Sequence, residues 1–427
     1  MPADAERPGQ PTRADTPLPH SAEVVVVGGG PAGAATAWWL ARAGIDVVLV
    51  DKARFPRPKP CSEYMSPQAS RLLEEMGVLA EVEAAGAAQL KGMVIRAPNG
   101  SLIRGVFAGA HRWRGHRDRG LSLQRTLLDP ILLDAARRAG ARVVEGASVH
   151  DVTLDRAGRA SGVTVATDGL RATPLRARLV IGADGLRSVV ARRLVLTRTS
   201  RFPRRIALVT HYAGIADVGD LGEMHVDRDG YMGIASVGNG LANVAVVIPA
   251  SRAGELSAGR ERFIEQWIEA RPQLRDRFVA AARATPVRAT GPFASRARRA
   301  WAPGAALVGD AADFFDPFTG EGIYAALRGG ELLAPYAVAA LAATSPLGER
   351  TALEAYERAR RHEFGGKWLV ERMIGTAVAF PPLLDRAATV LSRRPAMADL
   401  LVGVTGDFVP ASAVLNPAFL ARLLLLP

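Results

Sequence analysis

Residues 23–33 read Glu-Val-Val-Val-Val-Gly-Gly-Gly-Pro-Ala-Gly, and this stretch decides the fold. The apolar, β-branched run at residues 23–27 predicts a buried parallel strand that ends in a tight glycine turn. The Ala-rich segment at residues 31–43 predicts a helix, and the apolar run at residues 46–50 predicts a second strand. Together they form a strand-helix-strand unit whose length suits a parallel crossover.

The glycines of this turn have the spacing Gly28-x-Gly30-x-x-Gly33. The first glycine permits the turn, the second lets the backbone approach a diphosphate, and the third packs the helix on the strand. Amide groups at the start of the helix then face the phosphates. Asp51 lies 23 residues after Gly28, at the end of the second strand, where a carboxylate accepts hydrogen bonds from a ribose diol. The unit predicts a dinucleotide site, in which we also place Lys52.

Farther along the chain, strand and helix patterns alternate before helical patterns take over. Segments 93–96 and 102–106 flank Pro98-Asn99-Gly100 and predict a hairpin, and Ser66-Pro67 predicts the start of a helix. Further predicted elements are a helix at 127–139, strands at 179–182, 206–212, 230–237, 242–249 and 305–308, and a helix at 320–341. Residues 353–427 have a helical pattern that prolines interrupt.

Composition and charge limit the class of protein. The chain has 427 residues, of which 48% are apolar, so it can bury a large core. Its 54 basic and 42 acidic residues leave a net charge of +12, which favours anionic partners such as a phosphorylated cofactor, an acidic substrate or an anionic membrane face. No recognised nucleic-acid motif accompanies this charge, so we expect no nucleic-acid partner.

The chain has one cysteine, Cys61. A single cysteine excludes an internal disulfide framework and a multi-thiolate metal site, and we expect no metal. It also favours a reducing compartment, which predicts a cytoplasmic protein. Residues 1–20 are Pro-rich and polar, without the apolar stretch of a signal peptide, and predict a disordered tail. No segment offers the ~20 uninterrupted apolar residues of a membrane span.

A second motif occupies residues 179–192, which read L-V-I-G-A-D-G-L-R-S-V-V-A-R. The pattern predicts a strand that leads into an Asp184-Gly185 turn. A helix is expected to begin near Ser188.

A third motif occupies residues 305–327, which read A-A-L-V-G-D-A-A-D-F-F-D-P-F-T-G-E-G-I-Y-A-A-L. Asp310 ends a predicted strand, and Pro317 precedes a predicted long helix. Asp310 can hold a ribityl hydroxyl, while the amides around Gly322 and Ile323 can stabilise negative charge on a reduced flavin ring.

With three motifs in this order and spacing, residues 22–340 resemble the para-hydroxybenzoate-hydroxylase-fold flavoproteins, which include aromatic hydroxylases, flavin halogenases and geranylgeranyl reductases. The resemblance implies FAD as the cofactor. It also implies that Arg125, at the opening of a helix, contacts the flavin. The motifs and the resemblance together assign the following residues to FAD: Gly28, Gly30, Gly33, Asp51, Lys52, Arg125, Asp184, Asp310, Pro317, Gly322 and Ile323.

We therefore expect an α/β protein with a Rossmann-type FAD-binding domain, an inserted antiparallel-sheet substrate domain and a helical C-terminal region. The insertion is required because the Gly309-Asp310 motif must return to the flavin that the first glycine turn begins to bind. The expected divisions are a disordered tail at 1–20, FAD-binding segments at 21–90, 121–200 and 295–345, substrate-domain segments at 91–120 and 201–294, and the helical C-terminal region at 346–427.

Details of three motifs separate the branches of this family. Many aromatic hydroxylases have Arg seven residues after the Asp of the Asp-Gly motif, whereas this chain has Ala191 there, which is more similar to the reductase and halogenase branch. The segment 55–67, F-P-R-P-K-P-C-S-E-Y-M-S-P, also resembles that branch, where an analogous loop borders the flavin. Residues 230–235, Gly-Tyr-Met-Gly-Ile-Ala, lack the Trp and the Phe-Pro that geranylgeranyl reductases carry, and the halogenase Trp-x-Trp-x-Ile-Pro signature is absent.

What remains resembles the single-component monooxygenases of polyketide and terpenoid pathways. The resemblance implies reduction of FAD by the co-substrate NAD(P)H, activation of O₂, and hydroxylation of a small aromatic or lipophilic secondary metabolite. Two alternatives stay open: an FAD-dependent reductase of prenyl-chain double bonds, and a non-catalytic lipid-binding protein of the same fold. The sequence does not predict an oligomeric state.

Several residues have both a functional and a structural interpretation. Cys61, His211 and Tyr231 are candidates for the substrate pocket, but a free cysteine is commonly a small buried group and the other two fit within a sheet. The arginines of segment 192–205 either bind the NADPH phosphate or form a solvated face. The apolar segment 416–426 either makes peripheral contact with a membrane or packs on the body of the protein.

Overall fold

The computed structural model describes residues 17–109, 111–167, 171–199, 204–293 and 295–424. Its first sheet has five parallel strands in the order β21, β11, β1, β2 and β8, with β1 near the centre. The bounds are β1 (Ser21–Val27), β2 (Val47–Asp51), β8 (Arg142–Glu145), β11 (Thr173–Gly182) and β21 (Ala305–Leu307). Antiparallel strands extend this sheet: β20 (Trp301–Ala302) pairs with β21, while β10 (Ala160–Thr167) pairs with β11 and with β9 (Ala147–Leu154).

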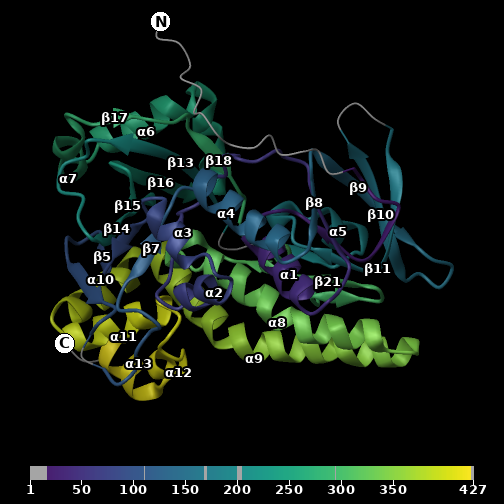
Figure 1. Ribbon diagram of the computed structural model, residues 1–427. Helices are drawn as coiled ribbons and strands as arrows, with labels where there is room; N and C mark the ends of the chain where they lie inside the picture. The colour runs from purple at the N-terminus through teal and green to yellow at the C-terminus, as the bar shows by residue number, and fades with distance from the viewer. Residues whose placement is uncertain (1–16, 110, 168–170, 200–203, 294, 425–427) are drawn as a thin grey trace, which may run out of the picture.

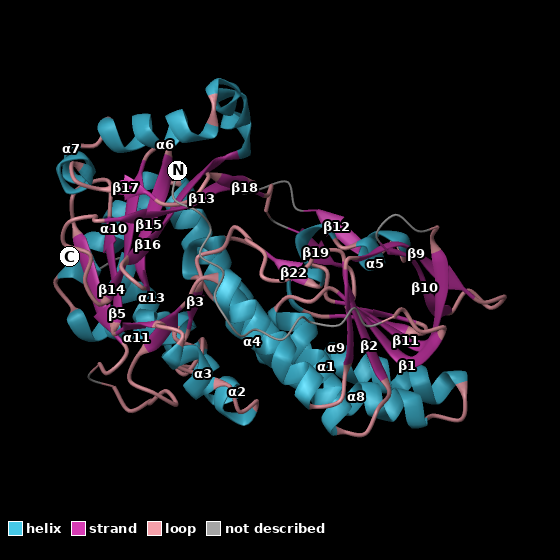
Figure 2. Cartoon of the chain, turned by 45° about the horizontal axis from the view of Figure 1, so that its top comes forward, coloured by secondary structure: helices cyan, strands magenta, loops and turns pink. Residues whose placement is uncertain are grey.

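Three helices pack beside this sheet: α1 (Pro31–Arg42), α4 (Arg125–Arg138) and α8 (Gly322–Ala342). Figure 2 shows them as a layer against the fanned strands β1, β2 and β11. Small residues let α1 and α8 approach closely, because a Cβ on Gly330 would lie 2.7 Å from the amide nitrogen of Thr36. All residues of β2 are buried, which explains why its sequence is a continuous apolar run up to Asp51 rather than an alternating one.

A second large sheet is built from two separate parts of the chain. Its strand order is β17, β13, β16, β15, β14, β5 and β6, and β18 also pairs with β13. The bounds are β5 (Gly92–Arg96), β6 (Leu102–Val106), β13 (Arg205–Ala213), β14 (Leu221–Asp227), β15 (Gly230–Gly238), β16 (Leu241–Pro249), β17 (Ala282–Arg283) and β18 (Arg288–Thr290). We call it the substrate sheet. The parallel pair β14 and β5 joins the two parts.

Helix α6 (Arg260–Glu269) covers the outer face of the substrate sheet, where Ile264 and Trp267 pack with Leu208 and Val246. Figure 1 shows α6 above β13, β15 and β16. Two three-stranded sheets lie between the larger units: β3 (Tyr64–Met65), β7 (Gly120–Ser122) and β4 (Ala88–Leu90), and β12 (Thr197–Thr199), β19 (Ser295–Ala297) and β22 (Asp313–Phe314). Short helices α2 (Ala69–Glu75), α3 (Leu79–Ala84), α5 (Val189–Arg193) and α7 (Pro272–Arg275) complete this part.

The C-terminal region consists of helices, most of which begin at a proline. They are α9 (Pro346–Ala379), α10 (Pro381–Ser392), α11 (Pro395–Thr405), α12 (Ser412–Leu415) and α13 (Pro417–Leu424). Proline suits the first helical position because its missing N–H has no partner there in any case. In Figure 1, α9 runs along the base of the molecule from the first sheet to the other C-terminal helices. Phe419 of α13 is buried in the same core as β5 and β15, so α13 packs on the body.

The expected fold class is confirmed: the chain is an α/β protein with a Rossmann-type domain, an inserted sheet and a helical C-terminal region. The hairpin of β5 and β6 is also confirmed. The expected domain boundaries stay a prediction. Among the described helices, none combines the length and apolar content needed to cross a membrane. Residues 1–16 of the expected tail, residues 200–203 of the arginine segment and residues 425–427 lie outside the described residues.

Two helix starts differ from the expectation. The helix expected to begin at Pro67 begins at Ala69, because Ser66 accepts a hydrogen bond from the Ala69 amide through its carbonyl oxygen at 2.9 Å and forms a turn ahead of the helix. The helix expected from residue 320 begins at Gly322, since Gly320 has a φ of +73°, which an α-helix does not accommodate.

Candidate cofactor and substrate site

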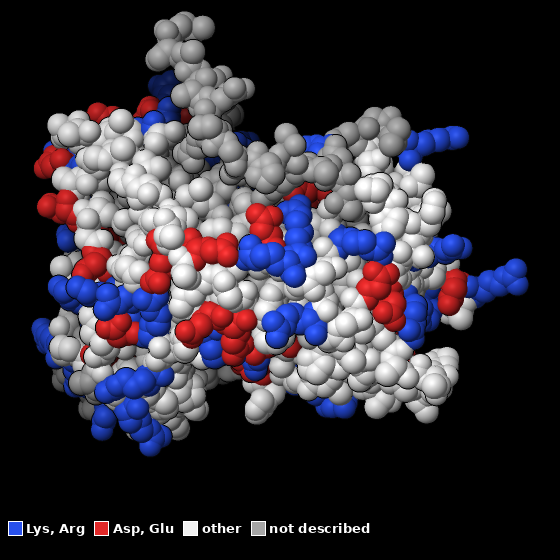
Figure 3. Space-filling view, in the orientation of Figure 1, with Lys and Arg blue, Asp and Glu red and all other residues white. Residues whose placement is uncertain are grey.

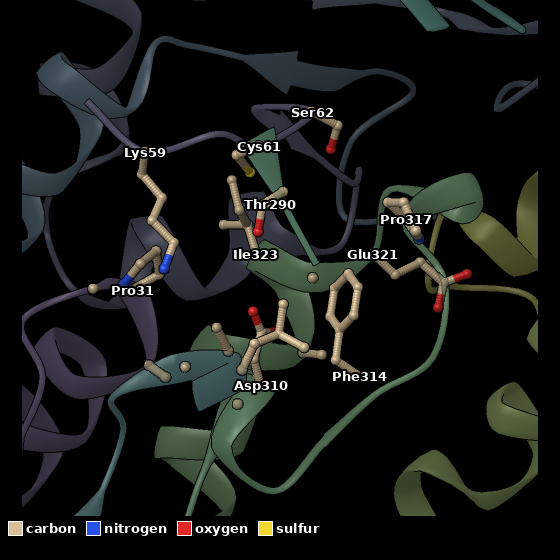
Figure 4. A pocket seen from close by; sticks show the side chains of 18 of the residues that line it. Pro31, Lys59, Cys61, Ser62, Thr290, Asp310, Phe314, Pro317, Glu321 and Ile323 are labelled. Atoms are coloured by element: carbon tan, nitrogen blue, oxygen red, sulfur yellow. The ribbon is translucent and has the colours of Figure 1, made fainter. Parts of the chain in front are cut away.

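A cavity of about 580 Å³ lies between the first sheet and the substrate sheet. The turns after β1, β2, β11 and β21 line one part, and the inner face of the substrate sheet lines another. Ligands of parallel α/β sheets bind at the carboxyl ends of the strands, which is where these turns meet. Figure 4 shows the cavity from close by, with Lys59 on one side of Ile323, Glu321 on the other, and Asp310 below Ile323 in this view.

The glycine turn after β1 forms an open cradle at the cavity. Gly28 has a φ of +105°, and a Cβ there would lie 2.5 Å from the carbonyl oxygen of Ala183. Gly30, at the N-cap of α1, would place a Cβ toward the cavity, where its nearest neighbours are the guanidinium groups of Arg125 and Arg57 at 3.5 and 3.7 Å. An extended anion fits this arrangement, because helix amides and guanidinium groups surround the space that a side chain would fill.

Gly33 has a different role from the two glycines that line the cavity. A Cβ on Gly33 would lie 1.8 Å from the carbonyl oxygen of Gly28, so only glycine lets α1 pack this closely on β1. Gly33 is buried and does not line the cavity. The packing role expected for the third glycine fits this position.

Asp51 closes the cradle at the end of β2. Its Oδ2 accepts a hydrogen bond from the Gly29 amide at 2.6 Å, and its Oδ1 accepts one from the Ala53 amide at 2.7 Å. These amides fix the carboxylate at the cavity wall, with lone pairs left for a ligand hydroxyl. Lys52 also lines the cavity, and its side chain is exposed.

Arg125, the first residue of α4, is buried at the cavity wall. Its Nε and Nη2 donate to the two carboxylate oxygens of Asp129 at 2.6 and 2.9 Å, and Arg57 lies 3.2 Å from the same carboxylate. Burial lowers the pKa of Arg125, but the charges and hydrogen bonds of Asp129 and Cys61 together outweigh burial and raise the pKa. Arg125 is therefore a fixed cation beside the cradle. The motif reading missed Arg57 and Lys59, although both stand in the segment 55–67 that resembles a flavin loop.

Two further carboxylates of the cavity, those of Asp184 and Asp310, can accept hydrogen bonds from a ligand. Asp184 accepts a hydrogen bond from the Val189 amide at 2.6 Å through Oδ2, but its buried Oδ1 has no partner among the described residues. Burial raises the pKa of Asp310, while Lys59 opposes this shift. Burial lowers the pKa of Lys59, which lines the same cavity. Acceptors of this kind suit the hydroxyl groups of FAD.

Replacing Asp310 by alanine is expected to weaken FAD binding by about 10-fold to 100-fold, because a hydrogen bond to a charged group contributes about 1.5–3 kcal/mol. Titration of flavin-free protein with FAD, followed by fluorescence, measures this change. Asp276→Ala is the matched control, since Asp276 is exposed and lies outside the cavity lining. Equal FAD affinity in both variants would exclude Asp310 from the cofactor site.

The end of the cavity where a flavin ring is expected lies at the start of α8. Pro317, Gly322 and Ile323 line the cavity there, and Ile323 is buried. The first amides of α8 have no side-chain cap, so they are available to a negative ligand group.

The structure brings two of the three candidate pocket residues to the cavity. Cys61 lines it, and its Sγ accepts a hydrogen bond from the Glu63 amide at 3.3 Å. Tyr231 also lines it, but its hydroxyl donates to Asp316 Oδ1 at 2.8 Å. His211 is not among the lining residues; its Nε2 lies 2.7 Å from Glu63 Oε2. The sheet interpretation fits His211 better than a substrate contact.

Glu63 is a central residue that the motifs did not reveal. It is 2% exposed and has a φ of +62°. Its carboxylate accepts hydrogen bonds from His211, from the side chain of Asn243 at 3.0 Å and from the backbone amide of Arg125 at 2.9 Å. Glu63 thus ties the Cys61 loop to α4 and to two strands of the substrate sheet.

Helix α9 supplies cavity residues that the sequence reading also missed. Tyr356, Arg360, Phe364, Lys367 and Glu371 all line the cavity. Their spacing of three or four residues places them on one face of the helix. This spacing could have been recognised in the sequence, but it does not show which part of the protein that face of the helix contacts.

The basic charge is largely paired or dispersed. In Figure 3, acidic side chains lie among the basic ones over most of the visible face. Arg193 lies 3.2 Å from Asp151, which favours the solvated interpretation of its segment.

Comparisons with known proteins agree with the geometry. The model of an FAD binding domain family matches residues 21–367. The chain is 29% identical to the menaquinone reductase of Mycobacterium tuberculosis, over 91% of this chain and 92% of that protein. It is 32% identical to digeranylgeranylglycerophospholipid reductase 1 of Methanopyrus kandleri, over 75% of this chain and 81% of that protein.

Among solved structures, a myxobacterial FAD-dependent halogenase of chondrochloren is 25% identical, with a TM-score of 0.75, covering 83% of this chain and 82% of that one. The expected likeness to flavoproteins of the halogenase and reductase branch is confirmed. The cradle, the fixed cations and the carboxylate oxygen of Asp184 that lacks a partner among the described residues fit FAD, and the chain belongs to the FAD binding domain family as an FAD-dependent oxidoreductase.

Proposed function

We propose that the protein is an FAD-dependent reductase of carbon–carbon double bonds in a lipophilic, prenyl-type substrate, with NAD(P)H as the electron source. One observation carries this proposal: a single cavity runs from the FAD cradle to an apolar wall on the substrate sheet. FAD would supply a hydride when it is bound and reduced.

The apolar wall is made of cross-strand rows on the inner face of the substrate sheet. One row is Met224, Gly233, Ala245 and Val209, and the next is Tyr231, Val247 and Ala207. The polar groups that border these rows already have protein partners, since Tyr231 donates to Asp316 and Asn243 donates to Glu63 and to the Cys61 carbonyl oxygen. A substrate against this wall therefore meets apolar surface, which selects a lipophilic molecule.

The relatives support the same chemistry. Two proteins that match most of this chain are named as reductases, one of menaquinone and one of a digeranylgeranyl lipid. Both names describe substrates with prenyl chains. The role we assign to this chain's own residues is to bind FAD in the glycine cradle, to orient an apolar chain on the sheet and to exclude water from the space between them.

A monooxygenase that hydroxylates an aromatic or lipophilic metabolite is the second candidate. Residues 230–235 favour it, because they lack the Trp and Phe-Pro of the geranylgeranyl reductases. Gly233 and Ala235 of this segment line the cavity and leave room for a broad ring system. We also keep peripheral membrane contact through residues 416–426 as a proposal, although the packing of Phe419 favours a role in the core.

Turnover without oxygen separates the two candidates. We expect FAD-loaded protein with NADPH to add two hydrogens to geranylgeraniol or to a short-chain menaquinone under anaerobic conditions. Mass spectrometry after re-exposure to air detects the change, because a reduced quinone ring reoxidises whereas a saturated prenyl bond does not. A product that forms only in air and gains oxygen would favour the monooxygenase and contradict the reductase.

A further inference from the structure

We propose that Glu321 is the acid that protonates the substrate, with Lys367 holding its carboxyl group and Tyr64 completing the polar end of the cavity. This inference rests on the proposed reductase function. It assigns a catalytic group to a reaction for which the motifs named none.

Glu321 stands directly before α8 and is 7% exposed at the cavity wall. Figure 4 shows it beside Phe314 and Pro317, across Ile323 from Lys59. The acid thus lies at the flavin end of the cavity, away from the basic groups around the cradle. It is placed where a substrate that contacts the ring would end.

Lys367 of α9 fixes the carboxyl group of Glu321. Its Nζ lies 3.2 Å from Glu321 Oε2 and also forms an ion pair with Asp407. One ammonium therefore serves two carboxyl groups. Glu371, one turn farther along α9, adds a third acidic group at the same cavity wall. The cluster has more acids than cations, which favours retention of a proton.

Tyr64 supplies the independent observation. It is 8% exposed and lines the cavity, and its buried hydroxyl has no hydrogen-bond partner among the described residues. Buried hydroxyl groups are nearly always paired, so this one indicates a ligand or a transient partner in the cavity. Tyr64 lies next to the Glu321 segment, because a Cβ on the preceding residue, Gly320, would lie 3.0 Å from the Tyr64 ring. The two side chains therefore share a polar corner of the cavity beside the apolar wall of the substrate sheet.

The charge state of this cluster agrees with its geometry. Burial raises the pKa of Glu321, and Lys367 only partly opposes the shift. Burial and the charge of Glu321 raise the pKa of Glu371 well above its usual range. The groups that face these acids are Lys367 and Glu371 on α9, Tyr64 on β3, Asp407 after α11, and Asp313 and Asp316 before α8.

The proposed reduction adds one proton and one hydride across the double bond. One alkene carbon takes the proton of Glu321, using the π electron pair for the new C–H bond. The neighbouring carbon would receive the hydride that bound, reduced FAD supplies, so the alkene would be reduced by two electrons. Glu321 is left as a carboxylate paired with Lys367, and it regains a proton from Glu371 or from solvent. NAD(P)H restores the reduced cofactor.

The test compares Glu321→Gln with the conservative Glu321→Asp and with Glu331→Gln as the matched control. Glu331 lies on α8, the helix that follows Glu321, but it pairs with Arg71 and Arg328 and is not part of the cavity lining. The infrared difference spectrum of wild type minus E321Q at pH 7 should contain the C=O stretch of one protonated carboxyl group, which E331Q retains. A difference made only of carboxylate bands would overturn the proposal.

The second measurement is single turnover of dithionite-reduced holoprotein with geranylgeraniol, without oxygen. We expect oxidation of the flavin to slow by about 100-fold or more in E321Q, as for loss of a general acid, and to recover in part in E321D. FAD affinity and reduction by dithionite should not change. The wild-type rate should fall as pH rises through the raised pKa of Glu321, because the carboxylate has no proton to donate, and E321Q should lose this dependence.

The two proposals fail in different ways. If neither geranylgeraniol nor a short-chain menaquinone oxidises the reduced wild type, the reductase function is wrong. If the wild type turns over and E321Q matches it in rate and pH profile, only the role of Glu321 is wrong.

Discussion

Replacement of Gly33 by alanine is expected to abolish stable FAD binding. A Cβ at this position would lie 1.8 Å from the carbonyl oxygen of Gly28, which is backbone and has no rotamer to adopt. Helix α1 must then move away from β1, and its first amides move with it. Overpacking of a buried site costs about 1–3 kcal/mol and at times more, and an overlap with backbone belongs at the upper end of that range, so we expect FAD affinity to fall by about 100-fold or more. Flavin absorbance of the purified protein and FAD titration measure the loss.

Gly365→Ala is the control for this prediction. Gly365 lies within α9, and a Cβ there meets nothing within 4 Å. Alanine is the better helix former by about 1 kcal/mol, so this variant should bind FAD normally and unfold at a slightly higher temperature. An FAD-loaded Gly33→Ala protein with normal affinity would show that the close approach of α1 and β1 is not required.

The second large effect is expected from Glu63→Ala, which should lower the free energy of unfolding by about 3–5 kcal/mol. The carboxylate is buried and accepts hydrogen bonds from His211, Asn243 and the backbone of Arg125. Alanine leaves these buried donors without an acceptor. Because the donors belong to α4 and to the substrate sheet, FAD binding should weaken as well. Urea unfolding followed by circular dichroism gives the energy.

Glu74→Ala provides the contrast, because Glu74 also pairs with a histidine, His116, at 2.7 Å, but at the surface. An exposed pair contributes about 0–1 kcal/mol, so this variant should unfold close to the wild type. If the two variants lost equal stability, burial would not explain the importance of Glu63.

The sequence predicted the cofactor half of the site because its signals are local. Gly28, Gly30 and Asp51 lie within one strand-helix-strand unit, and the glycine spacing states the geometry that the backbone must adopt. Strands β1 and β2 could also be predicted, because strands that are buried on both faces have apolar runs in their sequences. The same holds for the β5 and β6 hairpin, whose turn residues specify the connection.

The substrate half could not be predicted because its contacts join distant parts of the chain. Glu63 meets His211 and Asn243, which are 148 and 180 residues away. Glu321 meets Lys367 only because α9 returns across the cavity. Neither pairing follows from a periodic pattern or a motif. His211 illustrates the difficulty: its strand was predicted, but the hydrogen bond between its ring and Glu63 was not.

The length of α9 makes the site sensitive to helical phase. Its 34 residues extend about 50 Å, and one face carries Tyr356, Arg360, Phe364, Lys367 and Glu371. Inserting a single residue after Phe364 would rotate everything beyond it by about 100°, since a helix turns once in about 3.6 residues. Lys367 and Glu371 would then no longer line the cavity, whereas Tyr356, Arg360 and Phe364 would keep their positions. Length variation in this helix is therefore tolerable only in whole turns, and only near its ends.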